Sequence, residues 1–242
     1  MLDAIILLTG PAEAPALAAA LRGHNPQLDI RHAVSLPDLV ALEPEFLRRA
    51  RLIAFTTPVV VPAAVLDQLG HGAYNFHPGP PHFPGWAPAH FAIYQRATEF
   101  GATVHVMIEQ VDAGPIVGAD LFDVPPGSSV NDLETMAFVR LARLFWGNAK
   151  SLATQTSPLA ELPIRWSGRK TMRHHYAAMC DIPPDISKDE LARRVAVFGR
   201  GDFGVHLTTT LHGIQFNAVA KDAALLPAET ALSAHKKQDR AA

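Results

Sequence analysis

The sequence predicts an open α/β fold, and three observations support this. Short, continuous apolar runs such as Ala4–Leu8 are typical of strands that are buried on both faces. Segments with the hydrophobic period of a helix separate these runs, and strands that alternate with helices usually pair in parallel. Glycine and proline follow the runs, as in Thr9-Gly10-Pro11. We therefore expect a Rossmann-like, mostly parallel sheet with helices on both faces.

The elements follow in order along the chain. After the first strand, an alanine- and leucine-rich helix is expected to run to about Leu21 and to stop at Gly23. Further strands are expected at residues 28–34, 52–55, 73–77, 102–108 and 115–124, with a helical stretch up to Arg49 and helices at 62–69 and 87–96. A longer helix then begins at Ser129, where Asp132 has capping-box spacing.

The C-terminal part of the sequence predicts a small α+β lobe that follows a polar, proline-containing connector. Ser187 and Glu190 have the spacing of a capping box and begin a helix that is expected to end at Gly199. A hairpin is expected to turn at His212-Gly213. These patterns divide the chain into a first domain at 1–150, a lobe at 151–226 and a flexible tail at 227–242.

Composition limits the classes of function. The 242 residues carry a formal net charge of -2 and contain no stretch dominated by Lys and Arg, so we expect no nucleic-acid partner. The single cysteine, Cys180, cannot form an intramolecular disulfide. A basic start with a long apolar run is missing at the N-terminus, as is any run of about 20 apolar residues. We expect a cytoplasmic protein with a small-molecule partner and no membrane partner.

The segment Tyr74-Asn75-Phe76-His77-Pro78 carries most of the chemical information. Side chains alternate along a strand, so Asn75 and His77 are expected to project from the same face. Both lie at the carboxyl end of an expected parallel strand, where open α/β sheets usually bind ligands. An amide and an imidazole at such a place can stabilise the negative charge that develops on a carbonyl oxygen under attack.

Asp112 is the expected third member of the site. It lies in a turn between two strands, and such a turn can return to the same edge of the sheet. A carboxylate there can orient His77, raise its pKa and keep it protonated, and relay a proton from an attacking amine. The alternative is structural, because Asn-x-His also caps turns and Asp-x-Gly is common turn chemistry. His105 is equally compatible with the site and with a structural role on a strand.

The wider pattern resembles the formyltransferase family that uses 10-formyltetrahydrofolate, which includes glycinamide ribonucleotide, methionyl-tRNA and nucleotide-sugar formyltransferases. The resemblance covers residues 52–145. Its motifs are Asn-Phe-His-Pro at 75–78, Pro-Gly-Trp-Ala-Pro at 84–88, Gly-Ala-Thr-Val-His at 101–105 and Asp-Ala-Gly-Pro-Ile at 112–116. Several ordered motifs at compatible spacing are more specific than any one of them.

The resemblance implies a role for each site residue. Asn75 and His77 would stabilise the tetrahedral intermediate, Asp112 would manage protons, and no metal is required. The pterin of 10-formyltetrahydrofolate would lie between residues 56–62 and the loop before Asp112. The expected folate-binding residues are Thr56, Val59, Val60, Val61, Gln110, Val111 and Asp112, and the expected acceptor-binding residues are Gly79, Pro80, Trp86 and His105.

The sequence also departs from the family. The family commonly has Ser-Leu-Leu-Pro after the His-Pro, where this chain has Gly79-Pro80-Pro81-His82-Phe83-Pro84, which changes the wall beside the formyl carbon. The glycinamide ribonucleotide enzymes bind a substrate phosphate at the turn after the first strand. Here that turn is Thr9-Gly10-Pro11-Ala12-Glu13-Ala14-Pro15, with two prolines that lack N–H groups and an acidic residue, which argues against purine synthesis. The acceptor and the oligomeric state stay open, with a homodimer as one possibility.

Three functions follow from these residues. The first is direct formyl transfer to a small-molecule amine without a covalent enzyme intermediate, with a protonated His77 at the oxyanion. The second is hydrolysis of 10-formyltetrahydrofolate, in which water replaces the amine. The third is a folate-binding module without catalysis. Consumption of the donor separates the third from the others, and dependence on an amine separates the first from the second.

Overall fold

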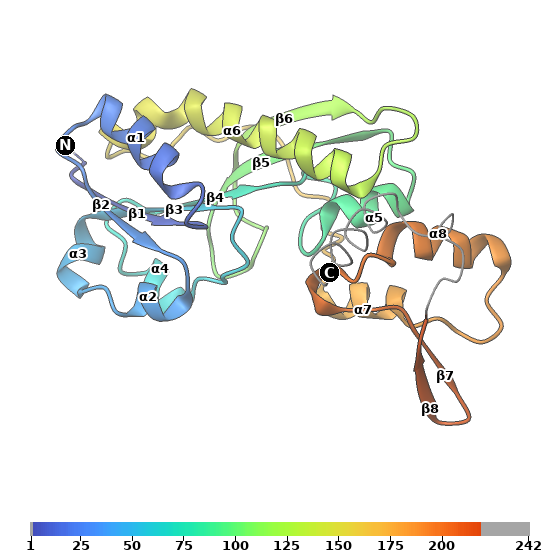
Figure 1. The fold of residues 1–242 in the computed structure, drawn as a ribbon. Helices are drawn as coiled ribbons and strands as arrows, with labels where there is room; N and C mark the ends of the chain where they lie inside the picture. The colour runs from blue at the N-terminus through green and yellow to red at the C-terminus, as the bar shows by residue number, and fades with distance from the viewer. Residues whose placement is uncertain (1, 219–242) are drawn as a thin grey trace, which may run out of the picture.

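A computed structural model describes residues 2–218 of the chain and shows a six-stranded sheet of the order β2-β1-β3-β4-β5-β6 (Figure 1). The first four strands in sequence pair in parallel, whereas β5 pairs antiparallel with β4 and β6 pairs antiparallel with β5. The expected open, mostly parallel sheet is therefore confirmed. The strands are β1 Ala4–Leu8, β2 Asp29–Ala33, β3 Ala50–Phe55, β4 Ala73–His77, β5 Glu99–Val106 and β6 Ile116–Asp123.

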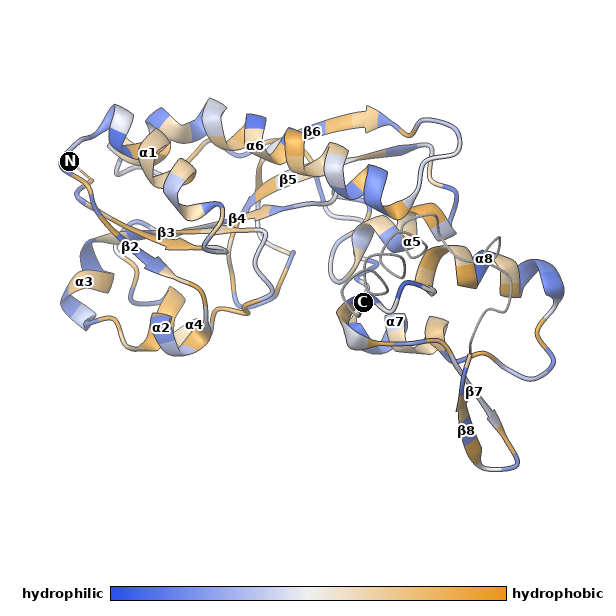
Figure 2. Ribbon diagram, viewed as in Figure 1, coloured by the Kyte–Doolittle hydropathy of each residue, from blue (hydrophilic) through white to orange (hydrophobic). Residues whose placement is uncertain are grey.

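Helices cover both faces of the sheet. Figure 1 shows α1 (Ala14–His24) and α6 (Val130–Thr154) over one face, and α2 (Leu36–Val40), α3 (Pro44–Arg49) and α4 (Ala63–Leu66) over the other. The alternation of side chains along the strands supplies both cores. In β1, Ile5 and Leu7 belong to the core under α1 and α6, while Ile6 and Leu8 belong to the opposite one. In Figure 2, β3 is accordingly coloured mostly as apolar.

One helical stretch differs from the sequence prediction. The segment expected to be helical up to Arg49 forms two helices, α2 and α3. Pro44 begins α3, and because proline has no backbone N–H, it cannot continue a helix that begins before it. Ser35 caps α2 through its bonds with Asp38. The long helix α6 begins, as predicted, after the Ser129–Asp132 capping box and continues to Thr154.

The C-terminal part packs against α5 (Pro88–Tyr94) and α6. It contains α7 (Arg173–Cys180), α8 (Lys188–Phe198), the short 3₁₀ helix η1 (Asp202–Gly204) and the hairpin of β7 (Thr208–Leu211) and β8 (Ile214–Asn217). The α8 helix and the hairpin were predicted, whereas α7 was not. Phe91 and Phe100 share a buried cluster with Tyr176 and Phe198, which attaches these helices to the sheet domain.

The last residues of the predicted hairpin, 219–220, and the predicted tail at 227–242 lie outside the described residues. Across residues 2–218, no helix is both long enough and apolar enough to span a membrane.

Candidate active site

The carboxyl end of β4 brings the first polar side chains together. Asn75 pairs with His105 of β5 across the antiparallel ladder, and His77 pairs with Thr103. The Nδ2 atom of Asn75 lies 3.1 Å from Nε2 of His105. Asn75 and His77 both line the same cavities, which agrees with the shared face that strand alternation predicts. The sequence leaves open whether His105 contacts the site or has a structural role on the strand. In the structure, His105 contacts the site.

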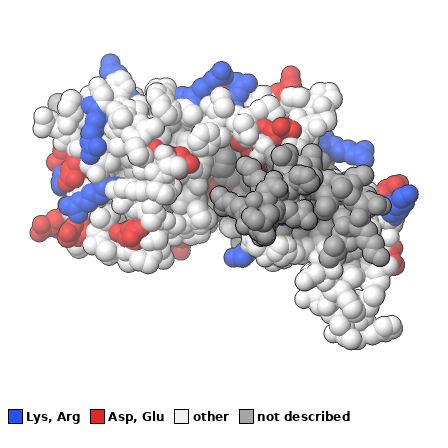
Figure 3. All heavy atoms as spheres, in the orientation of Figure 1, with Lys and Arg blue, Asp and Glu red and all other residues white. Residues whose placement is uncertain are grey.

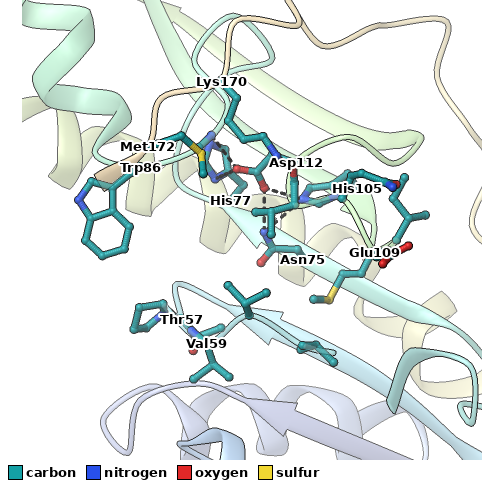
Figure 4. Close-up of a pocket in the computed structure, with 18 of the residues that line it drawn as sticks. Thr57, Val59, Asn75, His77, Trp86, His105, Glu109, Asp112, Lys170 and Met172 are labelled. Carbon is teal, nitrogen blue, oxygen red and sulfur yellow. Dashed lines mark hydrogen bonds and ion pairs between the residues drawn. The ribbon is translucent and has the colours of Figure 1, made fainter. Parts of the chain in front are cut away.

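Asp112 lies at the centre of these groups (Figure 4). Its Oδ1 is 3.1 Å from His105 Nε2 and 3.5 Å from Asn75 Nδ2, and its Oδ2 is 3.6 Å from His77 Nδ1. The backbone N–H of Gly85 donates to Oδ2 at 2.7 Å. The carboxylate thus connects the loop after β5, both histidines and the loop that precedes α5.

Backbone geometry brings Asp112 back to this edge of the sheet. Its φ of 48° lies in the left-handed region, which aspartate tolerates better than most residues. Two residues later the chain passes so close to β5 that a Cβ on Gly114 would lie 2.0 Å from the carbonyl oxygen of Val106. The Asp-x-Gly turn is therefore required for the position of the carboxylate.

Burial determines the protonation of the site. Burial lowers the pKa of His77 below its ordinary value of 6.5, and it outweighs the opposite effect of the neighbouring Asp112 carboxylate. Asp112 does raise the pKa of His77, as expected, but the expectation that this keeps His77 protonated is wrong, because the effect of burial is larger. Burial alone would raise the pKa of Asp112, but His77, His105 and the N–H of Gly85 together hold it well below its usual range.

The contacts of His77 also indicate which nitrogen carries its proton. Its Nε2 lies 3.2 Å from the carbonyl oxygen of Phe83, which can only accept a hydrogen bond. A neutral ring therefore has its proton on Nε2 and a free electron pair on Nδ1, which faces Asp112. His105 differs, because its Nδ1 lies 2.9 Å from the carbonyl of Val106 while Nε2 faces the carboxylate.

A cavity of about 330 Å³ opens on one side of this cluster. In Figure 4, Thr57 and Val59 lie across it from Asn75, His77 and Asp112. Its walls are largely apolar. The lining includes all but one of the residues expected to bind folate, namely Val59, Val60, Val61, Gln110, Val111 and Asp112.

A second cavity, of about 520 Å³, adjoins the first and shares Asn75, His77 and Trp86 with it. Thr56, the remaining residue expected to bind folate, lines this second cavity. Of the residues expected to bind the acceptor, Trp86 lines both cavities and His105 lines the first.

Gly79 and Pro80 are buried and lie outside the linings of both cavities. The Gly79 carbonyl accepts a hydrogen bond from Thr103 Oγ1 at 2.7 Å. A Cβ on Gly79 would lie 2.6 Å from His77 Nε2, so the glycine makes room for the imidazole.

Sequence reasoning missed the part of the site that the C-terminal segment supplies. Lys170, Thr171, Met172 and Arg173 line the first cavity, and Thr171 pairs with Gly85 through an isolated β-bridge.

Trp166 belongs to the same segment. Its indole N–H donates to the carbonyl of Gly114 at 2.8 Å, and its ring packs edge-on against His77 and His105. Within residues 2–218, no group of three or more His, Cys, Asp or Glu side chains has the geometry of a metal site.

The fold and the site define a class of protein. An open α/β sheet presents an amide and an imidazole where two cavities meet, with a second imidazole and an ionised carboxylate beside them in the first cavity. This arrangement is suited to transfer of an acyl group between two bound molecules. Comparison with known proteins gives the family. Residues 52–138, which include Asn75, His77 and Asp112, match the family described as formyl transferase.

Individual relatives agree with this match. Methionyl-tRNA formyltransferase of Listeria monocytogenes is 31% identical over 113 residues, which are 46% of this chain and 34% of that protein. The chain thus spans about a third of the length of the first curated relatives it matches. The resemblance to the formyltransferase family is confirmed over residues 52–138.

Solved structures extend the similarity of the fold to the C-terminal part. A sugar N-formyltransferase from Shewanella has a TM-score of 0.70 at 14% identity, with 91% of this chain and 98% of that chain covered. An N-formyltransferase from Helicobacter canadensis in complex with folinic acid and dTDP-3-aminofucose has a TM-score of 0.61 at 13% identity, with 88% and 85% covered. At this identity the likeness concerns the fold.

Proposed function

We propose that the protein transfers a formyl group from 10-formyltetrahydrofolate to the amine of a small-molecule acceptor. The observation that carries this proposal is the position of Asn75 and His77, which border both cavities at the point where the cavities meet. A donor in one cavity and an acceptor in the other would place their reacting atoms beside these two side chains.

The first cavity fits the pterin of the donor. Val59, Val61, Met107 and Ile108 supply apolar walls for a flat ring. The segment that holds Val59 is braced locally, because the N–H of Val59 bonds with Thr57 Oγ1 at 3.2 Å. Asn75 and Asp112 lie on the facing side, where the formyl-bearing nitrogen would have to lie for transfer to the second cavity (Figure 4).

Asn75 is assigned to the oxygen of the formyl group. Its amide nitrogen has two N–H groups and lies 3.1 Å from His105 Nε2 and 3.5 Å from Asp112 Oδ1. When the donor is bound, one of these N–H groups can instead donate to the negative charge that develops on the formyl oxygen as the amine attacks. Removal of one such donor typically slows acyl transfer by about 10² to 10³.

His77 and Asp112 are assigned to the proton. In the resting site the imidazole of His77 is neutral. The electron pair on its Nδ1 faces the ionised carboxylate of Asp112, whose Oδ2 lies 3.6 Å away. These two acceptors can take the proton that the amine loses when its nitrogen bonds to the formyl carbon. They return it to the folate nitrogen when the bond between that nitrogen and the formyl carbon breaks.

A small acceptor is favoured over a tRNA by the charge of the molecule. The formal net charge is -2, and on the described part of the face in Figure 3 the Lys and Arg side chains are interspersed with Asp and Glu. Proteins that bind nucleic acid through phosphates usually carry a clustered basic surface.

Hydrolysis of the donor is the second candidate, because the same three groups would serve a water molecule.

The test is loss of the donor in the presence and absence of a panel of amino sugars, amino acids and other metabolite amines. We expect loss that depends on an amine, and a decrease of at least about a hundredfold in Asn75→Ala and His77→Ala. Binding of the stable analogue folinic acid should persist in both variants. Equal rates with and without every amine would refute the transferase.

A further inference from the structure

We propose that Phe203, in the loop at residues 201–204 of the C-terminal part, forms one wall of the acceptor site together with Trp86, and that the two rings bind the ring of a cyclic amine with at most one anionic group. The inference rests on the proposed function and concerns the second cavity, the acceptor cavity. It makes Phe203 a residue that determines acceptor specificity.

The backbone of this loop is shaped to present Phe203. Gly201 and Gly204 have φ values of 71°, and Phe203 itself has a φ of 57°, which is rare for a bulky side chain. Phe203 is 45% exposed and lines the acceptor cavity. Its ring centroid lies 5.0 Å from that of Trp86, at an interplanar angle of 59°. The two rings therefore form one continuous aromatic wall.

A partly buried hydrogen bond anchors the loop to the sheet domain. Asp202, which precedes Phe203, lies with Oδ2 2.9 Å from Nε2 of His90 in α5. The side chain of His90 is 1% exposed, and its ring contacts those of Phe203 and Tyr176. The strained conformation of Phe203 is thus held by its neighbour, since strain of this kind persists only where surrounding contacts fix it.

The charges around the acceptor cavity limit what it can bind. Among the described residues that line it, Arg173 is the one cationic side chain at neutral pH and Glu134 the one carboxylate. The guanidinium of Arg173 lies 5.9 Å from the ring of Trp86, so it can reach an anionic group on a molecule stacked against that wall. A nucleoside diphosphate usually requires several donors to its phosphates.

The helix N-terminus at the same edge of the sheet does not add such donors. Glu13 occupies the N-cap of α1, and Pro15 removes an N–H from the first turn. A Cβ on Gly10 would lie 2.6 Å from Oε2 of Glu13, so a carboxylate covers the turn after β1. A phosphate would be repelled there, which favours an acceptor with few anionic groups.

The experiment compares Phe203→Ala with Phe216→Ala at saturating 10-formyltetrahydrofolate. Phe216 is a matched control, because it is 47% exposed, lies in the same C-terminal part and is outside the lining of either cavity. The acceptor probes are glucosamine, glucosamine 6-phosphate and dTDP-3-aminofucose within a wider panel of cyclic amines. Initial rates give kcat and the KM for each acceptor, and a second series at saturating acceptor with varied 10-formyltetrahydrofolate gives the KM for the donor.

We expect Phe203→Ala to raise the acceptor KM by about tenfold, as for the loss of one aromatic contact, with the donor KM unchanged. Phe216→Ala should change neither. Asp202→Asn, which weakens the anchor, should raise the acceptor KM by a smaller factor without lowering kcat.

Two results would overturn the proposal while leaving formyl transfer intact. One is amine-dependent transfer with the same acceptor KM in Phe203→Ala and the wild type. The other is a higher kcat/KM for dTDP-3-aminofucose than for every cyclic amine that carries at most one anionic group. If no amine in the panel accelerates loss of the donor, the proposed function and the acceptor site are refuted together.

Discussion

Two buried histidines, each facing an aspartate, allow a direct comparison between the candidate active site and the contact of the C-terminal part. His77 lies 3.6 Å from Asp112, whereas His90 is hydrogen-bonded to Asp202 at 2.9 Å. Burial lowers the pKa of both histidines, and in both the carboxylate opposes the shift. The electrostatic surroundings of the two pairs are therefore alike.

The difference lies in what else each pair contacts. His77 borders two cavities, and the carboxylate that faces it also contacts Asn75 and His105. His90 is enclosed by aromatic rings, including those of Tyr176 and Phe198. A buried His–Asp pair with a shifted pKa is thus no evidence of catalysis by itself, and access to a ligand decides between chemistry and structure.

The largest expected effect separates the two aspartates. Asp112→Asn keeps the size of the side chain but removes the ionised acceptor, so we expect kcat for formyl transfer to fall by about 10³. Asp202→Asn should leave kcat within about threefold, because Asp202 contacts no reacting atom in the proposed site. Equal losses of kcat in the two variants, measured at saturating donor and acceptor, would contradict the distinction.

The free energy of unfolding should depend more strongly on His90 than on His77. His90→Ala removes a hydrogen bond to a carboxylate and a ring packed among aromatic side chains, so we expect the free energy of unfolding to fall by about 3 kcal/mol. His77→Ala should cost about 1 kcal/mol, because its space opens to a cavity. Urea denaturation of the two variants measures both values, and a larger loss for His77→Ala would refute the assignment.

The pH dependence of stability tests the burial of both rings. A histidine whose pKa is lowered by folding binds its proton more readily in the unfolded chain, so its contribution to stability is complete above 6.5 and is lost as the pH falls below that value. Each ring should steepen the loss between pH 7 and 5 by up to about 1.4 kcal/mol per pH unit. His77→Gln and His90→Gln should each reduce this slope.

Asp112 does not contribute to the pH dependence of stability between pH 7 and 5. Its pKa is lowered from an ordinary value of 3.8, so its contribution to stability is complete above 3.8 and is lost only at lower pH. A slope between pH 7 and 5 that is the same in the wild type and both glutamine variants would show that neither ring has a lowered pKa.

The smallest expected effect concerns Trp166, whose ring packs edge-on against His77. Trp166→Phe keeps an aromatic edge but removes the hydrogen bond to the carbonyl of Gly114. We expect kcat/KM to fall by about three- to tenfold, with the loss of one neutral hydrogen bond near the Asp112 turn. An unchanged value in a steady-state assay would show that this contact does not position the loop.

Periodicity in the sequence predicts one part of this comparison well. The alternation along β4 places Asn75 and His77 on one face, and the Asp-x-Gly turn returns Asp112 to that edge. Both features depend on the backbone conformation of residues that are close together in the sequence, so the residue types there predict them. The core strands and the capped helix α6 could be predicted for the same reason.

The contact of the C-terminal part with the sheet domain depends on residues that are far apart in the sequence. His90 meets Asp202 across 112 positions, and Gly85 pairs with Thr171 across a comparable distance. No periodic signal marks such contacts. The protonation of His77 was predicted wrongly because burial, which outweighs the nearby carboxylate, is a property of the folded chain.

The most direct test of the account is the product balance of a single incubation with 10-formyltetrahydrofolate and an accepted amine. The account predicts one formylated amine and one tetrahydrofolate for each donor consumed, with no formate above the blank. It also predicts that Asp112→Asn abolishes both products together while still binding folinic acid. Formate released in place of the formylated amine would contradict direct transfer and identify the protein as a hydrolase.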